Sequence, residues 1–178
     1  MASSERLEGD EMMLVVMIDD ENVLFAVDTL NERVQNLEPV WRQIAKDLME
    51  LEEQIFATQG SVIGKPWAPL SPKTIRQKQR KGFPLEPLVR TGRLKASLTD
   101  ESSDEMVLDI DPLGLTFGSA LLVDRGDWFL APIHHFGAPR RNIPARALMP
   151  DNQFLVGRYR ERWQDYFLNY LSEEKEFL

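Results

Sequence analysis

The chain has 178 residues, of which 43% are hydrophobic and 28% charged, so it can form one domain with an ordinary core. It contains no cysteine and only two histidines, His134 and His135, which excludes disulfides, thiolate chemistry and a histidine-rich metal site. The net charge of −8 argues against general affinity for nucleic acid, and no apolar run approaches the roughly 18 residues that span a bilayer.

Residues 1–10 are polar and acidic, without the basic and apolar regions of a signal peptide. We therefore expect a loose tail at 1–10, a single domain over 11–178, and a soluble protein made in the cytosol. The apolar run 12–18 predicts a buried strand, because it is short and rich in β-branched residues.

Two helices are predicted next. The first begins after the acids Asp19, Asp20 and Glu21 and covers 22–34, where valines and a leucine recur at helical spacing. These acids could bind a hard cation such as Mg²⁺, but negative charge at a helix start explains them more simply. The second helix covers 36–57 and has a long apolar stripe: Leu37, Val40, Trp41, Ile44, Leu48, Leu51 and Ile55. Gln59-Gly60 is expected to end it.

A proline-rich, strongly basic segment follows. Between residues 61 and 98 there are nine Lys and Arg against one acid, Glu86, so this segment carries +8 and the rest of the chain −16. Its prolines predict a long loop, interrupted by one short helix over 72–80 that Ser71 caps and Gly82 ends.

The basic segment has three interpretations: a solvated surface, a contact with phosphates, or docking on an acidic surface of a partner or of another copy. We favour docking, because Trp67 and Phe83 are the only aromatic residues of the segment, so the interleaved stacking platform of a single-strand binder is missing, and because the whole chain is acidic. Charged side chains have little reason to be buried, so the candidate interface residues are Lys73, Arg76, Lys78, Arg80, Lys81, Arg140 and Arg141.

From residue 94 the apolar residues alternate. The alternation predicts antiparallel strands at 94–98, 106–110 and 115–117, with a turn at 111–114 joining the last two. Loops are expected at 121–130 and 138–150, on either side of a short element at 133–137. A last helix follows, capped by Asp151 or Asn152, with the stripe Val156, Tyr159, Trp163, Phe167, Tyr170 and Leu171.

No catalytic constellation is present: the sequence has no Gly-rich phosphate loop, no Cys/His ligand spacing and no Gly-x-Ser-x-Gly turn. The adjacent His134 and His135 would point in different directions and cannot both face one site. Asp109 and Asp111 flank a turn and are expected to be solvated there. We therefore expect no enzymatic activity, no cofactor and no metal.

Three blocks of residues, in order, resemble the phage virion morphogenesis family, which comprises tail-completion and neck proteins of Mu-like and related tailed phages. They are Gly64-x-Pro66-Trp67-x-Pro69-Leu70-Ser71 with Thr74 and Lys78; Leu88-x-x-Thr91-Gly92-x-Leu94-x-x-Ser97; and Ile133-His134-His135-Phe136-Gly137 with Ile143-Pro144-Ala145-Arg146. His135 stands where the family tends to have Gln, Ala147-Leu148 replaces Pro-Phe, and 123–128 looks like an insertion.

The resemblance implies an α+β fold, an antiparallel sheet packed with N-terminal and C-terminal helices around a long Pro-rich loop. It also implies a structural virion protein, assembled in the host cytoplasm, that completes or terminates the tail and joins it to the head connector. The implied partners are further copies in a ring, hexameric by analogy with the family, then tail-tube or terminator proteins and connector proteins. The alternative is a DNA-contacting module whose basic segment 65–95 lines the DNA channel, at least transiently.

The motif residues also have structural interpretations. Trp67 is expected to anchor the long loop with its ring buried, Gly92 to supply a positive φ before the first strand, and Gly137 to do the same after the histidines. His134 is expected to be a hydrogen-bonded core or interface residue. The set with expected structural roles is Gly64, Pro66, Trp67, Pro69, Leu70, Thr74, Thr91, Gly92, Leu94, His134, Gly137, Pro144 and Arg146.

Overall fold

The computed structural model of the chain describes residues 21–123, 126 and 128–172. These residues form six α-helices, two 3-10 helices and one antiparallel pair of strands, which confirms the predicted α+β class. In chain order they are α1 (Glu21–Gln35), α2 (Glu38–Ala57), η1 (Ser61–Ile63), α3 (Pro72–Arg80), α4 (Arg93–Thr99), β1 (Met106–Asp111), β2 (Gly114–Ser119), α5 (Leu130–Phe136), η2 (Pro139–Arg141) and α6 (Asn152–Ser172). The predicted tail 1–10, the predicted strand 12–18 and the acids Asp19 and Asp20 lie outside the described residues.

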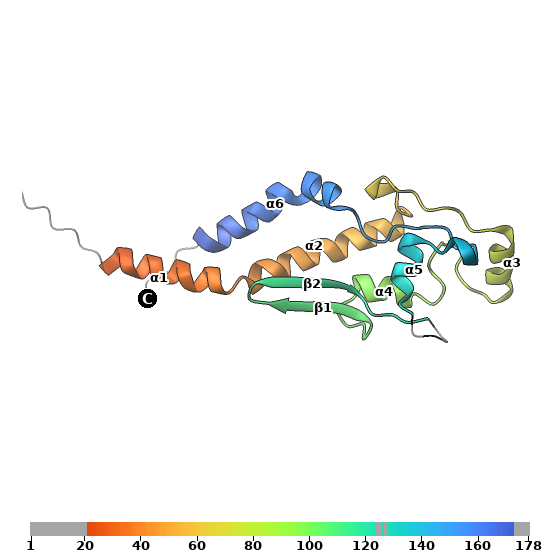
Figure 1. Cartoon of the computed structure of the whole chain (residues 1–178), viewed down its shortest axis with the longest axis horizontal. Helices are drawn as coiled ribbons and strands as arrows, with labels where there is room; N and C mark the ends of the chain where they lie inside the picture. Colours follow the sequence, from red (N-terminus) through yellow and green to blue (C-terminus); the bar gives the residue numbers. More distant parts are fainter. Residues whose placement is uncertain (1–20, 124–125, 127, 173–178) are drawn as a thin grey trace, which may run out of the picture.

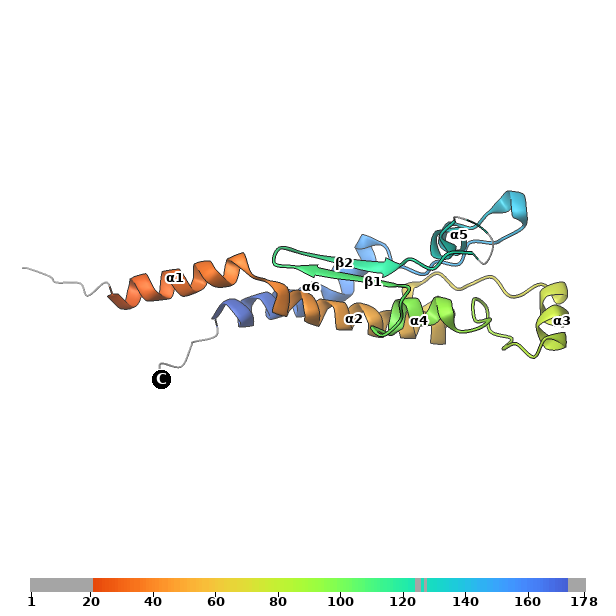
Figure 2. The same ribbon diagram turned by 90° about the horizontal axis from the view of Figure 1, so that it is seen from below.

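Helix α2 is the central element of an elongated molecule (Figure 1). It packs against α4, α6 and both strands, while α1 lies at one end of the molecule and α3 at the other (Figures 1 and 2). The predicted stripe explains this position, because Val40, Ile44, Leu51 and Ile55 are all buried. The predicted helix stop is also confirmed: Gln59 and Gly60 both have positive φ, at 49° and 81°.

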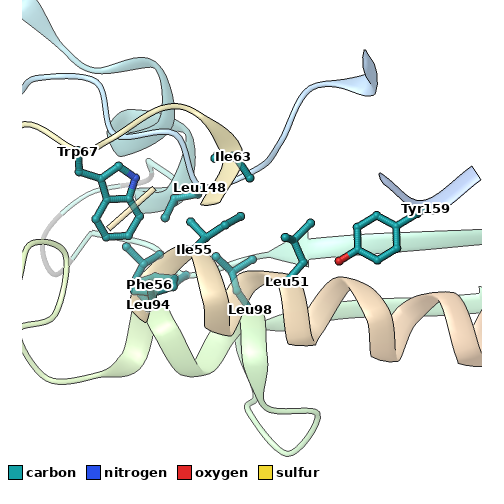
Figure 3. Packing of buried hydrophobic residues seen from close by; sticks show 10 residues of the cluster. Leu51, Ile55, Phe56, Ile63, Trp67, Leu94, Leu98, Leu148 and Tyr159 are labelled. Carbon is teal, nitrogen blue, oxygen red and sulfur yellow. The ribbon is translucent and has the colours of Figure 1, made fainter. Parts of the chain in front are cut away.

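The hydrophobic core lies where the C-terminal half of α2 meets α4 and the two long loops (Figure 3). Leu51 and Ile55 of α2 contact a cluster that includes Leu98 of α4 and Leu148 of the loop before α6. Residues from distant parts of the chain meet here. The core therefore fixes how the loops leave the domain.

A buried carboxylate holds α6 on α2. Asp47 is 4% exposed, accepts a hydrogen bond from Trp163 Nε1 at 3.0 Å and forms an ion pair with the Arg162 guanidinium at 2.8 Å. Trp41 of α2 also meets Phe167 of α6 edge to face, with ring centroids 5.3 Å apart. Asp47 is not part of the predicted apolar stripe of α2, yet α6 covers it with donors that satisfy its charge.

The hairpin follows the prediction. β1 pairs with β2 in antiparallel register, with Leu108 opposite Phe117, and the turn closes between Asp111 and Gly114. The Asp111 carboxylate accepts a 2.8 Å hydrogen bond from the Leu113 amide, so this acid has a turn-stabilising role.

The predicted strand at 94–98 is wrong, because these residues belong to helix α4. Leu94 and Leu98 are four residues apart, a spacing that fits one face of a helix as well as one face of a strand. Both side chains are buried, and Ser97 between them donates to the carbonyl oxygen of Leu94 at 2.9 Å. Gly92 does adopt the predicted positive φ, 84°, but it precedes this helix and not a strand.

The other predicted helices are confirmed with small changes. In α3 the Ser71 hydroxyl accepts the Thr74 amide at 3.1 Å, as expected of an N-cap with Pro72 next to it. In α6 the cap is Asp151, whose carboxylate accepts the Phe154 amide at 2.9 Å. Val156 is 56% exposed and is the one member of the predicted α6 stripe that the described residues leave largely uncovered.

Candidate protein interface

Helix α3 carries the largest group of cations among the candidate interface residues. Lys73, Arg76 and Arg80 recur at the three- and four-residue spacing that places side chains on one face of a helix. Together with Gln77 and Lys81 they line a hollow of about 540 Å³. All four cations are exposed, and among the described residues none has an ion-pair partner.

Such a group destabilises the isolated helix, because like charges at this spacing repel one another. Arg76 and Arg80 are one turn apart, and Lys73 lies one turn before Arg76. The arrangement therefore suits contact with something negatively charged outside the chain.

Lys78 departs from the expectation that the charges of this segment are exposed. It is 9% exposed, and its ammonium donates to the carbonyl oxygens of Pro84 at 2.8 Å, Glu86 at 2.7 Å and Val89 at 2.5 Å. Burial lowers its pKa from the ordinary lysine value, with a smaller lowering by Arg146 against the opposing effect of Glu86. The Lys78 ammonium thus uses its three donors to hold the loop that follows α3, and little of the side chain is accessible to a partner protein.

Arg140 and Arg141 lie on the short helix η2, on the loop that follows α5, and both are exposed. They border a second hollow of about 480 Å³ whose other walls are Trp128, Ile133, Ala138 and Pro139. This hollow combines an apolar wall with a cationic rim. Sequence patterns do not reveal this hollow, because its walls come from three separate segments.

Trp67 anchors the proline-rich loop, as predicted. Its ring is 6% exposed and meets Phe56 edge to face, at 5.3 Å between centroids. Its Nε1 donates to the carbonyl oxygen of Ala147 at 2.7 Å. The close packing also explains Gly60, since a Cβ there would lie 2.7 Å from the Trp67 ring and 2.3 Å from the carbonyl oxygen of Lys65.

Arg146 joins the same two loops. Its Nε donates to the carbonyl oxygen of Ala68 at 2.9 Å and its Nη2 to that of Pro69 at 3.3 Å, while its own amide donates to the carbonyl oxygen of His134 at 2.7 Å. The side chain is 7% exposed and burial lowers its pKa. Arg146 thus ties the first motif block to the third through backbone atoms.

The three motif blocks surround one cavity of about 420 Å³. Its lining includes members of each block: Pro69, Leu70, Thr74 and Lys78 from the first, Leu88 and Leu94 from the second, and His134, Pro144 and Arg146 from the third. The motif residues are therefore neighbours in space, and the contacts described above show them holding α3 and its loops in place. Thr91 and Gly64 are exposed and lie outside this lining.

Gly137 is required for two reasons. Its φ is 75°, and a Cβ there would lie 2.7 Å from the Ala145 amide nitrogen and 3.0 Å from the Ile143 carbonyl oxygen. The predicted positive φ is confirmed, and the close approach is a further reason that the sequence did not reveal.

The two histidines face different surroundings, as predicted. His134 lines the motif cavity, and within the described ranges its buried Nδ1 has no hydrogen-bond partner. Burial, then the charge of Arg146, lowers the pKa of His134. His135 Nδ1 accepts the amides of Leu148 at 3.2 Å and Met149 at 3.3 Å. Within the described ranges no three His, Asp or Glu side chains are grouped so as to hold a metal ion.

Sequence reasoning missed two charged residues in the interior. Glu52 is 1% exposed, its Oε2 has no hydrogen-bond partner among the described residues, and burial raises its pKa well above the ordinary value. Asp47 is the other. The apolar periodicity of α2 predicts which face of the helix is packed. It does not predict which polar residues are covered by neighbouring elements.

Comparison with known proteins finds a family match. The sequence model of the phage virion morphogenesis family matches residues 18–171, a range that contains all three motif blocks. No curated protein and no solved structure matches the chain. No helix in the described ranges is long and apolar enough to cross a membrane. Because the match covers most of its length, the chain belongs to the phage virion morphogenesis family, and this membership supports a structural or morphogenesis role in the phage.

Proposed function

We propose that this chain is a non-enzymatic tail-completion or neck protein, which forms a homo-oligomeric ring at the head–tail junction and joins tail-tube or terminator proteins to the head connector. The observation that carries the proposal is the exposed cationic face of α3 at one end of an elongated molecule. Family membership supports a role in building the particle.

The contacts around α3 support a docking role for this face. Lys78, Arg146 and Trp67 are occupied with holding the loops on either side of the helix. Lys73, Arg76, Arg80 and Lys81 make no comparable contact within the described part of the chain. The buried residues thus hold α3 in place, and its exposed cations form a surface that suits an acidic partner.

The test is complementation of a phage that lacks this protein. The variant Lys73→Glu/Arg76→Glu/Arg80→Glu should fold, because the three side chains are exposed, but should leave heads and tails unjoined in electron micrographs. The matched control is Lys46→Glu/Arg160→Glu, which reverses exposed cations on α2 and α6. Normal particles from the α3 variant, or a protein missing from purified virions, would contradict the proposal.

A second candidate function is a DNA contact by the same face, because cations at this spacing can neutralise successive phosphates. It predicts binding to duplex DNA with an affinity that falls steeply as salt rises. The α3 variant should then lose both binding and salt dependence, while the control keeps them. Absence of binding by the wild-type protein at low salt would eliminate this alternative.

A further inference from the structure

Helix α1 exposes an apolar stripe on its surface. Leu24, Val27, Leu30 and Val34 recur at helical spacing and are 58%, 56%, 46% and 48% exposed. The helix touches the rest of the molecule near its C-terminal end, where Arg33 donates to the carbonyl oxygens of Tyr170 at 3.0 Å and Leu171 at 3.3 Å. Isolated helices of about 15 residues are marginal in water, so α1 needs a further surface against its stripe.

The hollow between Trp128 and η2 has the complementary character. Its walls are apolar, and the described residues leave Trp128 and the nearby Phe129 65% and 51% exposed, two large aromatic side chains side by side in the chain. Its volume of about 480 Å³ is enough for side chains of the size of leucine and valine.

The charges of the two surfaces are also complementary. The sequence of α1 has three acids, Glu21, Asp28 and Glu32, against Arg33, a net −2. The sequence 128–150 has no acid and three arginines, Arg140, Arg141 and Arg146, a net +3. Arg140 and Arg141 stand on the rim of the hollow, where they would meet Asp28 and Glu32 beside the α1 stripe.

The positions of the two surfaces exclude pairing within one molecule. α1 lies at one end of the elongated chain, and α5, next to the hollow, lies toward the other (Figures 1 and 2). Two different surfaces on opposite ends of identical molecules give a head-to-tail contact, which closes into a ring when the rotation between copies allows it.

We propose that the α1 stripe of one copy docks into the Trp128–η2 hollow of the next copy, with Arg140 and Arg141 pairing with the acids of α1. This contact rests on the proposed homo-oligomer and names the surfaces that would build it. It is separate from the cationic face of α3, which remains available for other proteins.

The test uses two full-length variants that each lose one side of the contact. Val27→Glu/Leu30→Glu places charges in the α1 stripe while keeping good helix formers, and Arg140→Glu/Arg141→Glu reverses the rim. The stripe variant would bury unpaired charges in an apolar contact, and the rim variant would oppose the acids of α1 with like charges, so each variant alone should associate at least about 100-fold more weakly than wild type, as measured by light scattering after size exclusion. Thermal unfolding at low concentration should show that both variants fold.

Mixing the two variants gives the decisive result. Each retains the surface that the other has lost, so an equimolar mixture should form heterodimers of twice the chain mass and nothing larger. The control Leu85→Glu/Leu113→Glu, which charges exposed leucines elsewhere, should assemble like wild type. Because the chain has no cysteine, Leu24→Cys in one copy and Pro139→Cys in another should also cross-link on oxidation, whereas Leu113→Cys should not.

A mixture without heterodimers would overturn the head-to-tail contact. A rim variant that assembles by itself would also overturn it, since that result is expected if two α1 stripes pair with each other. A stripe variant that assembles normally would overturn it as well, since that result is expected if the chain covers its own stripe. A wild-type protein that is monomeric both in solution and in the particle would overturn the proposed ring itself. The two failures are therefore distinguishable.

Discussion

The indole Nε1 of Trp67 donates a 2.7 Å hydrogen bond to the carbonyl oxygen of Ala147, a residue 80 positions further along the chain. This bond joins the proline-rich loop before α3 to the loop before α6. Both loops belong to motif blocks of the family, so the bond shows what these motifs do physically. They fix two long connections against one core.

Two substitutions of Trp67 separate the hydrogen bond from the packing. Trp67→Phe keeps an aromatic ring but leaves the Ala147 carbonyl without its donor, so we expect a loss of about 1–3 kcal/mol in the free energy of unfolding. Trp67→Ala also opens a cavity beside Phe56 and should cost about 3–5 kcal/mol. Urea denaturation measures both. A Trp67→Phe protein as stable as wild type would show that the bond contributes nothing.

Lys78 and Lys73 should behave in opposite ways although both are lysines of α3. Lys78→Met removes the donor shared by three carbonyl oxygens and should lower the free energy of unfolding by about 2 kcal/mol or more. Lys73→Met removes an exposed charge and should change it by less than about 0.5 kcal/mol. In the particle-joining assay the order of the two effects should be reversed: Lys73→Met should impair joining more than any Lys78 variant that still folds. Equal stability of the two variants would contradict the structural role of Lys78.

Three glycines give a graded series. Gly137→Ala meets both a positive φ and a backbone contact, so it should destabilise the protein by more than about 2 kcal/mol. Gly92→Ala meets only the positive φ, with open space around it, and should cost about 1–2 kcal/mol. Gly157→Ala lies within α6 in open space and should stabilise the protein by about 0.5–1 kcal/mol. Thermal unfolding measures the three melting temperatures, which should rise from Gly137→Ala through Gly92→Ala to Gly157→Ala. Any other order would contradict this prediction.

Glu52 predicts a measurable dependence of stability on pH. Burial raises its pKa in the folded state, so the folded protein keeps a proton that the unfolded chain releases above its ordinary pKa of about 4.3. The stability contributed by the protonated Glu52 is complete below about pH 4.3 and is lost as pH rises toward the folded-state pKa. The free energy of unfolding should fall by up to about 1.4 kcal/mol per pH unit in this range.

The Glu52→Gln variant isolates this contribution. It keeps the shape of the neutral carboxyl, so it should be more stable than wild type at neutral pH and similar to it near pH 4. Other groups titrate in both proteins, for example His134, whose lowered pKa weakens the fold as pH falls below about 6.5. The difference between the two unfolding curves removes those effects. A difference that does not change with pH would show that Glu52 is ionised in the folded state.

Much of the fold follows from local pattern. The stripe of α2, the Ser71-Pro72 start of α3 and the alternation of β1 and β2 each predict the element that forms, because each is a repeat or a cap that acts within a few residues. The 94–98 segment is the exception, since two leucines four residues apart satisfy both a helix and a strand. Packing of α4 against α2 and the hairpin decides between them.

The sequence by itself determined the family, the α+β class and the excess of positive charge between residues 61 and 98, since composition and motif order require no knowledge of contacts. Only the tertiary structure decided which charges are available for binding. Lys78 and Arg146 are enclosed by carbonyl oxygens brought from other segments, whereas Lys73 and Arg76 face outward. Likewise, the stripe of α1 fits an ordinary amphipathic helix by sequence, and the fold places it beyond the reach of its own core. Burial depends on residues far apart in the chain, which is why local pattern could not assign it.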